Sequence, residues 1–121
     1  MTERKFEDLV EEAISELPFE ILDKMDNVSI IVEDFPSKED MKKTGIKSPY
    51  HLFGLYVGVP LTKRTSTYGA VPPDVIIIYK KPLERAFRNE NEIKRQVKIT
   101  VAHEIAHHFG ISEKRLRELG Y

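Results

Sequence analysis

The feature that most constrains the fold is an uninterrupted apolar run, Val75-Ile76-Ile77-Ile78-Tyr79. Four of its five residues are β-branched, so the run is typical of a β-strand. Because apolar and polar residues do not alternate here, we expect both faces of this strand to be covered. A chain of 121 residues fits one domain, and we expect residues 1–121 to form it.

Other elements follow from apolar spacing and from the residues that begin and end helices. The predicted helices span residues 3–17, 82–87, 91–109 and 113–119, and the remaining predicted strands span residues 28–32 and 52–59. Asn89 or Asn91 can cap the helix over residues 91–109. Gly110 suits the end of that helix, and Ser112 can cap the next one. The intervening segments are predicted loops, with a helical turn near residues 39–43 and a long loop over residues 61–73.

Composition and charge exclude several classes of function. The formal net charge is −1, from 19 basic and 20 acidic residues, so nothing steers the chain toward nucleic acid or an anionic membrane. The chain has no cysteine, so any metal must be held by histidine and carboxylate side chains. The first residues are charged and unlike a signal peptide, and no apolar run is long enough to span a bilayer. We therefore expect a cytoplasmic protein.

The helix predicted over residues 91–109 contains the sequence His103-Glu104-Ile105-Ala106-His107. Its apolar stripe consists of Ile93, Val97, Val101, Ile105 and Phe109, and Ile99, Ala102 and Ala106 extend the apolar surface to another side. A helix that is apolar on almost all sides is usually buried, so we expect its last three turns to be buried. His103, Glu104 and His107 lie away from the stripe, and buried polar groups need partners such as a metal.

The spacing of these three residues fits a zinc site. His103 and His107 are one helical turn apart, so both imidazoles project from the same face and can hold one zinc ion. Glu104 lies about 100° around the helix from His103, where it can flank the metal and act as general base on a zinc-activated water. The alternative is a packed helix whose histidines face solvent or make core hydrogen bonds. That alternative explains one histidine easily, but two histidines and a glutamate poorly.

The residues from His103 to Glu113, HEIAHHFGISE, resemble the motif of the bacterial mini-zincins, H-E-x-x-H-x-x-G-x-x-D. These are small single-domain zincin-like metallopeptidases. Three upstream segments are similar to the strands and loop that precede the motif in this family: Gly54-Leu55-Tyr56, Gly58-Val59-Pro60-Leu61-Thr62 and Pro73-Asp74-Val75-Ile76-Ile77-Ile78-Tyr79. The resemblance spans residues 50–121, and its zinc motif is the most specific part.

The resemblance implies that zinc is held by His103, His107 and the residue at position 113. The family pattern has aspartate there, whereas this chain has Glu113, whose extra methylene moves the carboxylate by about 1.5 Å. An acid at the first position of the last helix is also favoured by the helix dipole alone. Glu118 or a water molecule is the alternative third ligand.

A tyrosine shortly after the third ligand, which can stabilise an oxyanion in larger relatives of this kind, is missing here. The residues Lys114-Arg115-Leu116 follow Glu113 instead. Tyr68, Tyr79 and Tyr121 are the candidates for that role, and packing or a surface position is the expectation for each of them.

We therefore expect an α+β fold that resembles the minimal zincin, with a twisted sheet of three or four strands packed on the metal-bearing helix and the N-terminal helix alongside. The expected function is hydrolysis of peptide bonds in a peptide or protein substrate, with Zn²⁺ as cofactor and the chain as a monomer. The segment 52–59 could pair with an extended peptide, and Gly58 would permit its close approach.

Two other functions are open. One is a zinc-binding domain with little or no peptidase activity that binds a peptide or protein partner. The other is a zinc-dependent RNA-processing enzyme, which fits less well because no histidine follows His108 and the net charge is not basic.

Overall fold

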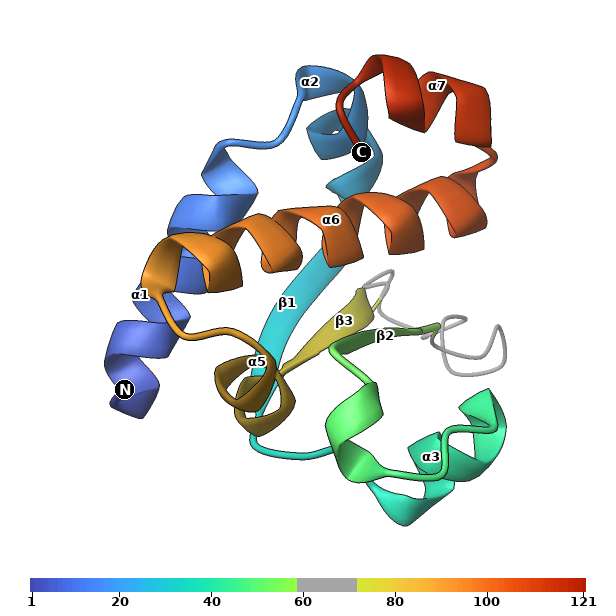
Figure 1. Ribbon diagram of the computed structural model, residues 1–121. Helices are drawn as coiled ribbons and strands as arrows, with labels where there is room; N and C mark the ends of the chain where they lie inside the picture. The colour runs from blue at the N-terminus through green and yellow to red at the C-terminus, as the bar shows by residue number, and fades with distance from the viewer. Residues whose placement is uncertain (59–71) are drawn as a thin grey trace.

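The computed structural model describes residues 1–58 and 72–121, and over these residues the fold is α+β (Figure 1). The strands are β1 (Val28–Glu33), β2 (Gly54–Val57) and β3 (Asp74–Tyr79). The helices are α1 (Glu3–Ser15), α2 (Phe19–Leu22), α3 (Lys38–Thr44), α5 (Lys80–Ala86), α6 (Glu90–Phe109) and α7 (Glu113–Glu118), with short 3₁₀ turns at Asp23–Met25 and Pro49–His51. The predicted loop over residues 61–73 lies outside the described residues except for its last two, which precede β3.

The apolar run Val75–Tyr79 forms nearly all of β3, the central strand of the sheet. The strand order is β1-β3-β2, with β1 parallel and β2 antiparallel to β3. Residues 76–79 of β3 are buried, so the prediction that both faces are covered is confirmed. Strand β2 is shorter than the predicted segment 52–59, of which residue 59 lies outside the described range.

Helix α6 lies across the sheet and forms the main core with it (Figure 1). Its buried stripe packs with Ile76 and Ile78 of β3 and with the apolar side of α1. The stripe consists of Ile93, Val97, Val101 and Ile105. Although α6 is 20 residues long, neither it nor any other helix in the described residues is apolar enough to cross a membrane.

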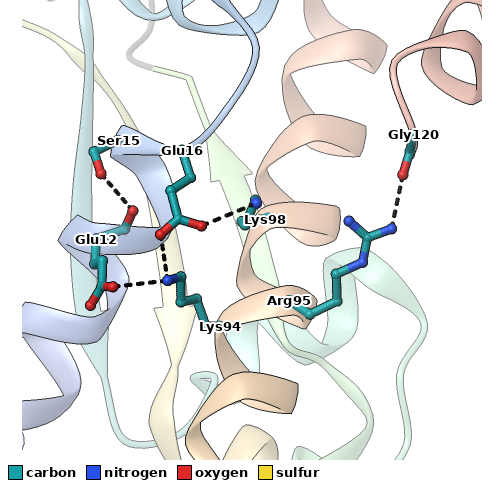
Figure 2. Close-up of polar contacts among 7 residues, drawn as sticks. All are labelled: Glu12, Ser15, Glu16, Lys94, Arg95, Lys98 and Gly120. Carbon is teal, nitrogen blue, oxygen red and sulfur yellow. Dashed lines mark hydrogen bonds and ion pairs between the residues drawn. The ribbon is translucent and has the colours of Figure 1, made fainter.

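Ion pairs fix the N-terminal helix α1 beside α6 (Figure 2). The ammonium of Lys94 contacts the carboxylates of both Glu12, at 2.9 Å, and Glu16. Lys98 reaches Glu16 at 3.3 Å. Because the contacts lie one helical turn apart on both helices, they align α1 with the half of α6 that precedes the histidines.

The ends of α6 are set by the residues that the sequence indicated. Asn89, rather than Asn91, is the N-cap, and its side chain accepts a hydrogen bond from the Glu92 N–H at 2.9 Å. Gly110 ends the helix with a φ of 75°, a left-handed conformation that glycine adopts without strain. Ser112 caps α7, as predicted. The turn at Gly110 therefore fixes where the helix that carries His103 and His107 stops and where α7 begins.

Candidate metal centre

His103, Glu104 and His107 line one cleft on the surface of α6. The cleft has a volume of about 480 Å³, and its other described lining residues, Gln96, Ile99 and Thr100, belong to the same helix. Both histidines line this cleft, as their helical spacing predicts. The cleft therefore brings two histidines and a carboxylate to one open surface.

The prediction that the last three turns of α6 are buried is wrong for the final turn. His103 and Glu104 are half-buried, His107 and His108 are exposed, and 40% of the surface of Phe109 is accessible. The sheet beneath α6 has three strands in the described part of the chain, and it covers the stripe that ends at Ile105 but not the opposite side. The imidazoles are consequently accessible from solvent.

Glu104 lies beside the backbone of β2. The Tyr56 N–H of this strand is near enough to the carboxylate to lower its pKa. The ladder explains this contact, because the Phe53 carbonyl accepts from the Tyr79 N–H at 2.9 Å and the alternating pattern then turns the Tyr56 N–H away from β3. Burial raises the pKa of Glu104 above its ordinary value, against the opposing effects of the nearby histidines and of the Tyr56 N–H.

Tyr56 makes further contacts near the end of α6, one helical turn after Glu104. Its ring stacks on the His108 imidazole at 3.8 Å between centroids and meets the Phe109 ring edge-on at 6.3 Å. Its hydroxyl donates to a carboxylate oxygen of Asp74 on β3. Tyr56 therefore ties the end of α6 to the sheet, which is a role that the sequence analysis missed because these residues are far apart in the chain.

Gly54 allows the site helix to lie against the edge strand. A Cβ atom at this position would stand 2.7 Å from Cγ2 of Thr100 on α6 and 3.1 Å from the carbonyl oxygen of Ile77. The first contact is shorter than Cβ atoms show in proteins and the second is unusually tight, so a side chain here would force Thr100 or the neighbouring backbone to shift. Gly54 therefore lets β2 lie close to α6 just before Glu104.

The third predicted ligand is not assembled with the two histidines. Glu113 is exposed in the first turn of α7, beside its Ser112 cap. Among residues 1–58 and 72–121, no three His, Asp or Glu side chains are grouped so that they could hold a metal ion. The segment 59–71 has none of these residue types in its sequence. The alternative ligand Glu118 is paired with Arg115 at 3.4 Å.

The two histidines themselves fit a metal ion. Neither His103 nor His107 makes a side-chain hydrogen bond or ion pair with any residue in the described parts of the chain. Their ring nitrogens are thus available, and imidazole pairs at this spacing suit zinc. The two imidazoles could therefore serve as protein ligands of a metal ion, with the Glu104 carboxylate beside them.

The candidate tyrosines pack within the fold. Tyr79 is fully buried, and its hydroxyl donates to Asp40 of α3 at 3.3 Å. Burial and the neighbouring Asp40 raise its pKa. Tyr121 is half-buried with the Arg95 guanidinium over its ring at 5.1 Å. Packing was the expectation for both residues and is confirmed, whereas Tyr68 lies outside the described residues.

Comparison with known proteins agrees with this geometry. A search of curated proteins found no match. The family model described as "Zincin-like metallopeptidase" matches residues 25–121, which include the whole sheet, the helix with both histidines and α7. Because that match covers most of the sequence, the chain belongs to the zincin-like metallopeptidase family.

Proposed function

We propose that this protein is a zinc-dependent peptide-bond hydrolase in which Glu104 acts as general base. One observation carries the proposal: His103, Glu104 and His107 line the same open cleft. Membership of a metallopeptidase family supports the same reaction class. Peptide hydrolysis needs a base beside the attacking water and accessible to substrate, and Glu104 lines the open cleft next to both histidines.

His103 and His107 would hold the zinc ion, with Glu113 as the proposed third protein ligand. When bound, zinc supplies Lewis acidity that makes water more acidic and polarises the scissile carbonyl. Since Glu113 is not grouped with the histidines in this structure, a water molecule in its place is the alternative.

Glu104 would take a proton from the attacking water and deliver it to the leaving amine. Burial raises its pKa in the metal-free chain, so its carboxylate binds the proton more strongly there than an exposed glutamate does. Its position in the cleft beside both histidines supports this role.

The substrate would bind as an extended strand beside β2. Among the described strands, β2 lies at one edge of the sheet, next to Glu104. A peptide paired with such an edge gains main-chain hydrogen bonds irrespective of its sequence. Gly58 follows the strand and has no side chain to obstruct the approach.

A zinc-binding domain without efficient peptidase activity is the second candidate. It is favoured by the position of Glu113 away from the histidines and by the packing of Tyr79 and Tyr121 inside the fold. Such a domain would bind zinc and a peptide through the same surfaces but would not need Glu104 as a base.

Metal content per chain, measured after purification without chelator, tests the proposal. We expect about one zinc per wild-type chain, retention in Glu104→Gln, and loss in His103→Ala and in Glu113→Ala. A screen of a peptide library should then find cleavage by the wild type and none by Glu104→Gln. Cleavage that survives in Glu104→Gln would remove the general base, and zinc binding without any cleavage would favour the second candidate. A wild type that takes up no zinc would overturn both.

A further inference from the structure

A second groove lies at the opposite edge of the sheet from the metal centre. It runs between α1 and β1 and has a volume of about 660 Å³. Its apolar lining comes from Val10 and Ile14 of α1 and from residues 30–32 of β1. In Figure 1 both elements lie on the same side of the molecule, and β2 lies on the other side of β3.

The backbone of β1 is open toward this groove. The Asp74 N–H donates to the Asn27 carbonyl at 3.1 Å, which sets the alternation of the parallel ladder. The N–H and C=O groups of Ile30 and Val32 consequently point away from β3. No hydrogen bond from any other described element reaches them. An edge of this kind is a template for one more strand.

Acidic side chains form the rim of the groove. Glu7, Asp8 and Glu11 all line it, and none has an ion-pair partner among residues 1–58 and 72–121. Glu12 of α1 and Glu16 just after its end differ, because lysines of α6 neutralise them (Figure 2). Glu3, at the start of α1, lies outside the groove. Three acids of α1 without an ion-pair partner in the described residues therefore lie beside the open strand edge.

We propose that this groove binds an extended segment of a protein partner in which basic and apolar residues alternate. The segment would add a strand to β1 through the outward groups of Ile30 and Val32. Its Lys or Arg side chains would lay their aliphatic stems on Val10 and Ile14 and place their charges among the acids of the rim.

The apolar side chains of the same segment would lie on the other face of the sheet. Ile31 of β1 points to that face, and 40% of its surface is accessible. An apolar residue of the added strand would stand beside it, so the alternation of the partner follows from the two faces of β1.

A second copy of this chain is a poor occupant of the groove. Pairing of two β1 edges would bring two acidic rims together, and like charges across an interface are unfavourable. The proposed partner segment is thus set by charge as well as by the open edge.

The experiment uses the full chain carrying Glu104→Gln, so that the peptide probe stays intact. The probe is a fluorescent seven-residue peptide of alternating valine and lysine, and binding is followed by anisotropy and by amide shifts in NMR spectra. We expect shifts at Ile30 and Val32, affinity at least about tenfold lower in the triple variant Glu7→Gln/Asp8→Asn/Glu11→Gln, and weaker binding at high salt.

Two controls separate this surface from unspecific attraction. Glu3→Gln, an acid of α1 outside the groove, should leave the affinity unchanged, and a peptide with its lysines grouped together should bind weakly. In Val32→Pro, an outward N–H is lost while the ladder to β3 is kept, so binding should fall. Binding that survives the triple variant, shifts confined to the α6 cleft, or dimers of the chain formed through β1 would each overturn the proposal.

Discussion

Glu104 is a half-buried carboxylate in the cleft of both histidines, and its replacement should separate metal binding from catalysis. Glu104→Gln keeps the size and shape of the side chain, so we expect the geometry of the cleft to be kept. We expect activity on any peptide that the library screen identifies to fall by about 10²- to 10⁴-fold, because a general base is lost. Zinc content should stay that of the wild type. An activity loss that follows zinc loss would contradict a direct role of Glu104.

A second prediction concerns the pKa of the same carboxylate in the metal-free protein. Burial raises the pKa of Glu104. In protein stripped of zinc, its carboxyl group should therefore titrate at higher pH than that of an exposed glutamate, whose pKa is about 4.3. NMR signals of the side-chain carboxyl, followed across acidic and neutral pH after treatment with chelator, test this. A pKa at or below the ordinary glutamate value would show that Glu104 is not shielded.

Gly54 gives a prediction that depends on packing alone. Gly54→Ala puts a methyl group 2.7 Å from Cγ2 of Thr100, and overpacking of this kind costs about 1–3 kcal/mol in the free energy of unfolding. Adding Thr100→Ser removes the clashing methyl and should recover part of the loss. Gly58→Ala is the control, since its nearest described neighbour would be at 3.9 Å. Chemical denaturation measures all four proteins, and equal effects of the two alanines would refute the close-approach argument.

At the scale of elements, the pairing of α1 with α6 should depend on pH. The hydrogen bond from Lys94 is the main cause that lowers the pKa of Glu16. A lowered pKa stabilises the fold above the ordinary glutamate pKa, and the effect is lost as the pH falls through the lowered value. Glu16→Gln should thus reduce Tm at pH 7 by no more than about 3 °C, and the difference should vanish in strong acid. Glu11→Gln, which removes an acid without an ion pair in the described residues, should leave Tm unchanged.

Elements and their ends were predictable from the sequence where short-range rules govern them. The continuous run in β3 predicted a covered strand. Asn89 and Ser112 mark the starts of helices because their side chains accept hydrogen bonds from backbone N–H groups a few residues away. Gly110 marks the end of a helix because a residue without a side chain adopts the left-handed conformation without strain. The spacing of His103 and His107 placed both on one side of α6 for the same reason.

Contacts between distant segments were not predictable from the sequence. The Tyr56 N–H lies near Glu104 because it points away from β3, and strand register is a property of the whole sheet. The exposure of His107 depends on how far the sheet extends beneath α6, which apolar spacing does not encode. The position of Glu113 depends on the direction that α7 takes after Gly110, so the motif spacing alone did not bring it to the histidines.

At the scale of the whole molecule, zinc should stabilise the fold by joining α6, which carries both histidines, to α7, which carries Glu113. An ion that binds the folded chain alone raises the free energy of unfolding by about 2.7 kcal/mol when its free concentration is a hundred times Kd. For a domain of this length, that gain corresponds to a rise in Tm of about 5–15 °C. Chelator should reverse the rise.

The zinc-dependent rise in Tm, compared between variants, then shows which residues bind the ion. His107→Ala should abolish the zinc-dependent rise in Tm, whereas His108→Ala, which removes the ring stacked on Tyr56, should keep it. If Glu113→Ala also abolishes the rise, α7 turns toward the histidines on zinc binding, because the two are apart without the metal. If Glu113→Ala keeps the full rise, the two histidines of α6 are the protein ligands that matter for stability, and the acid at the start of α7 acts only on its own helix.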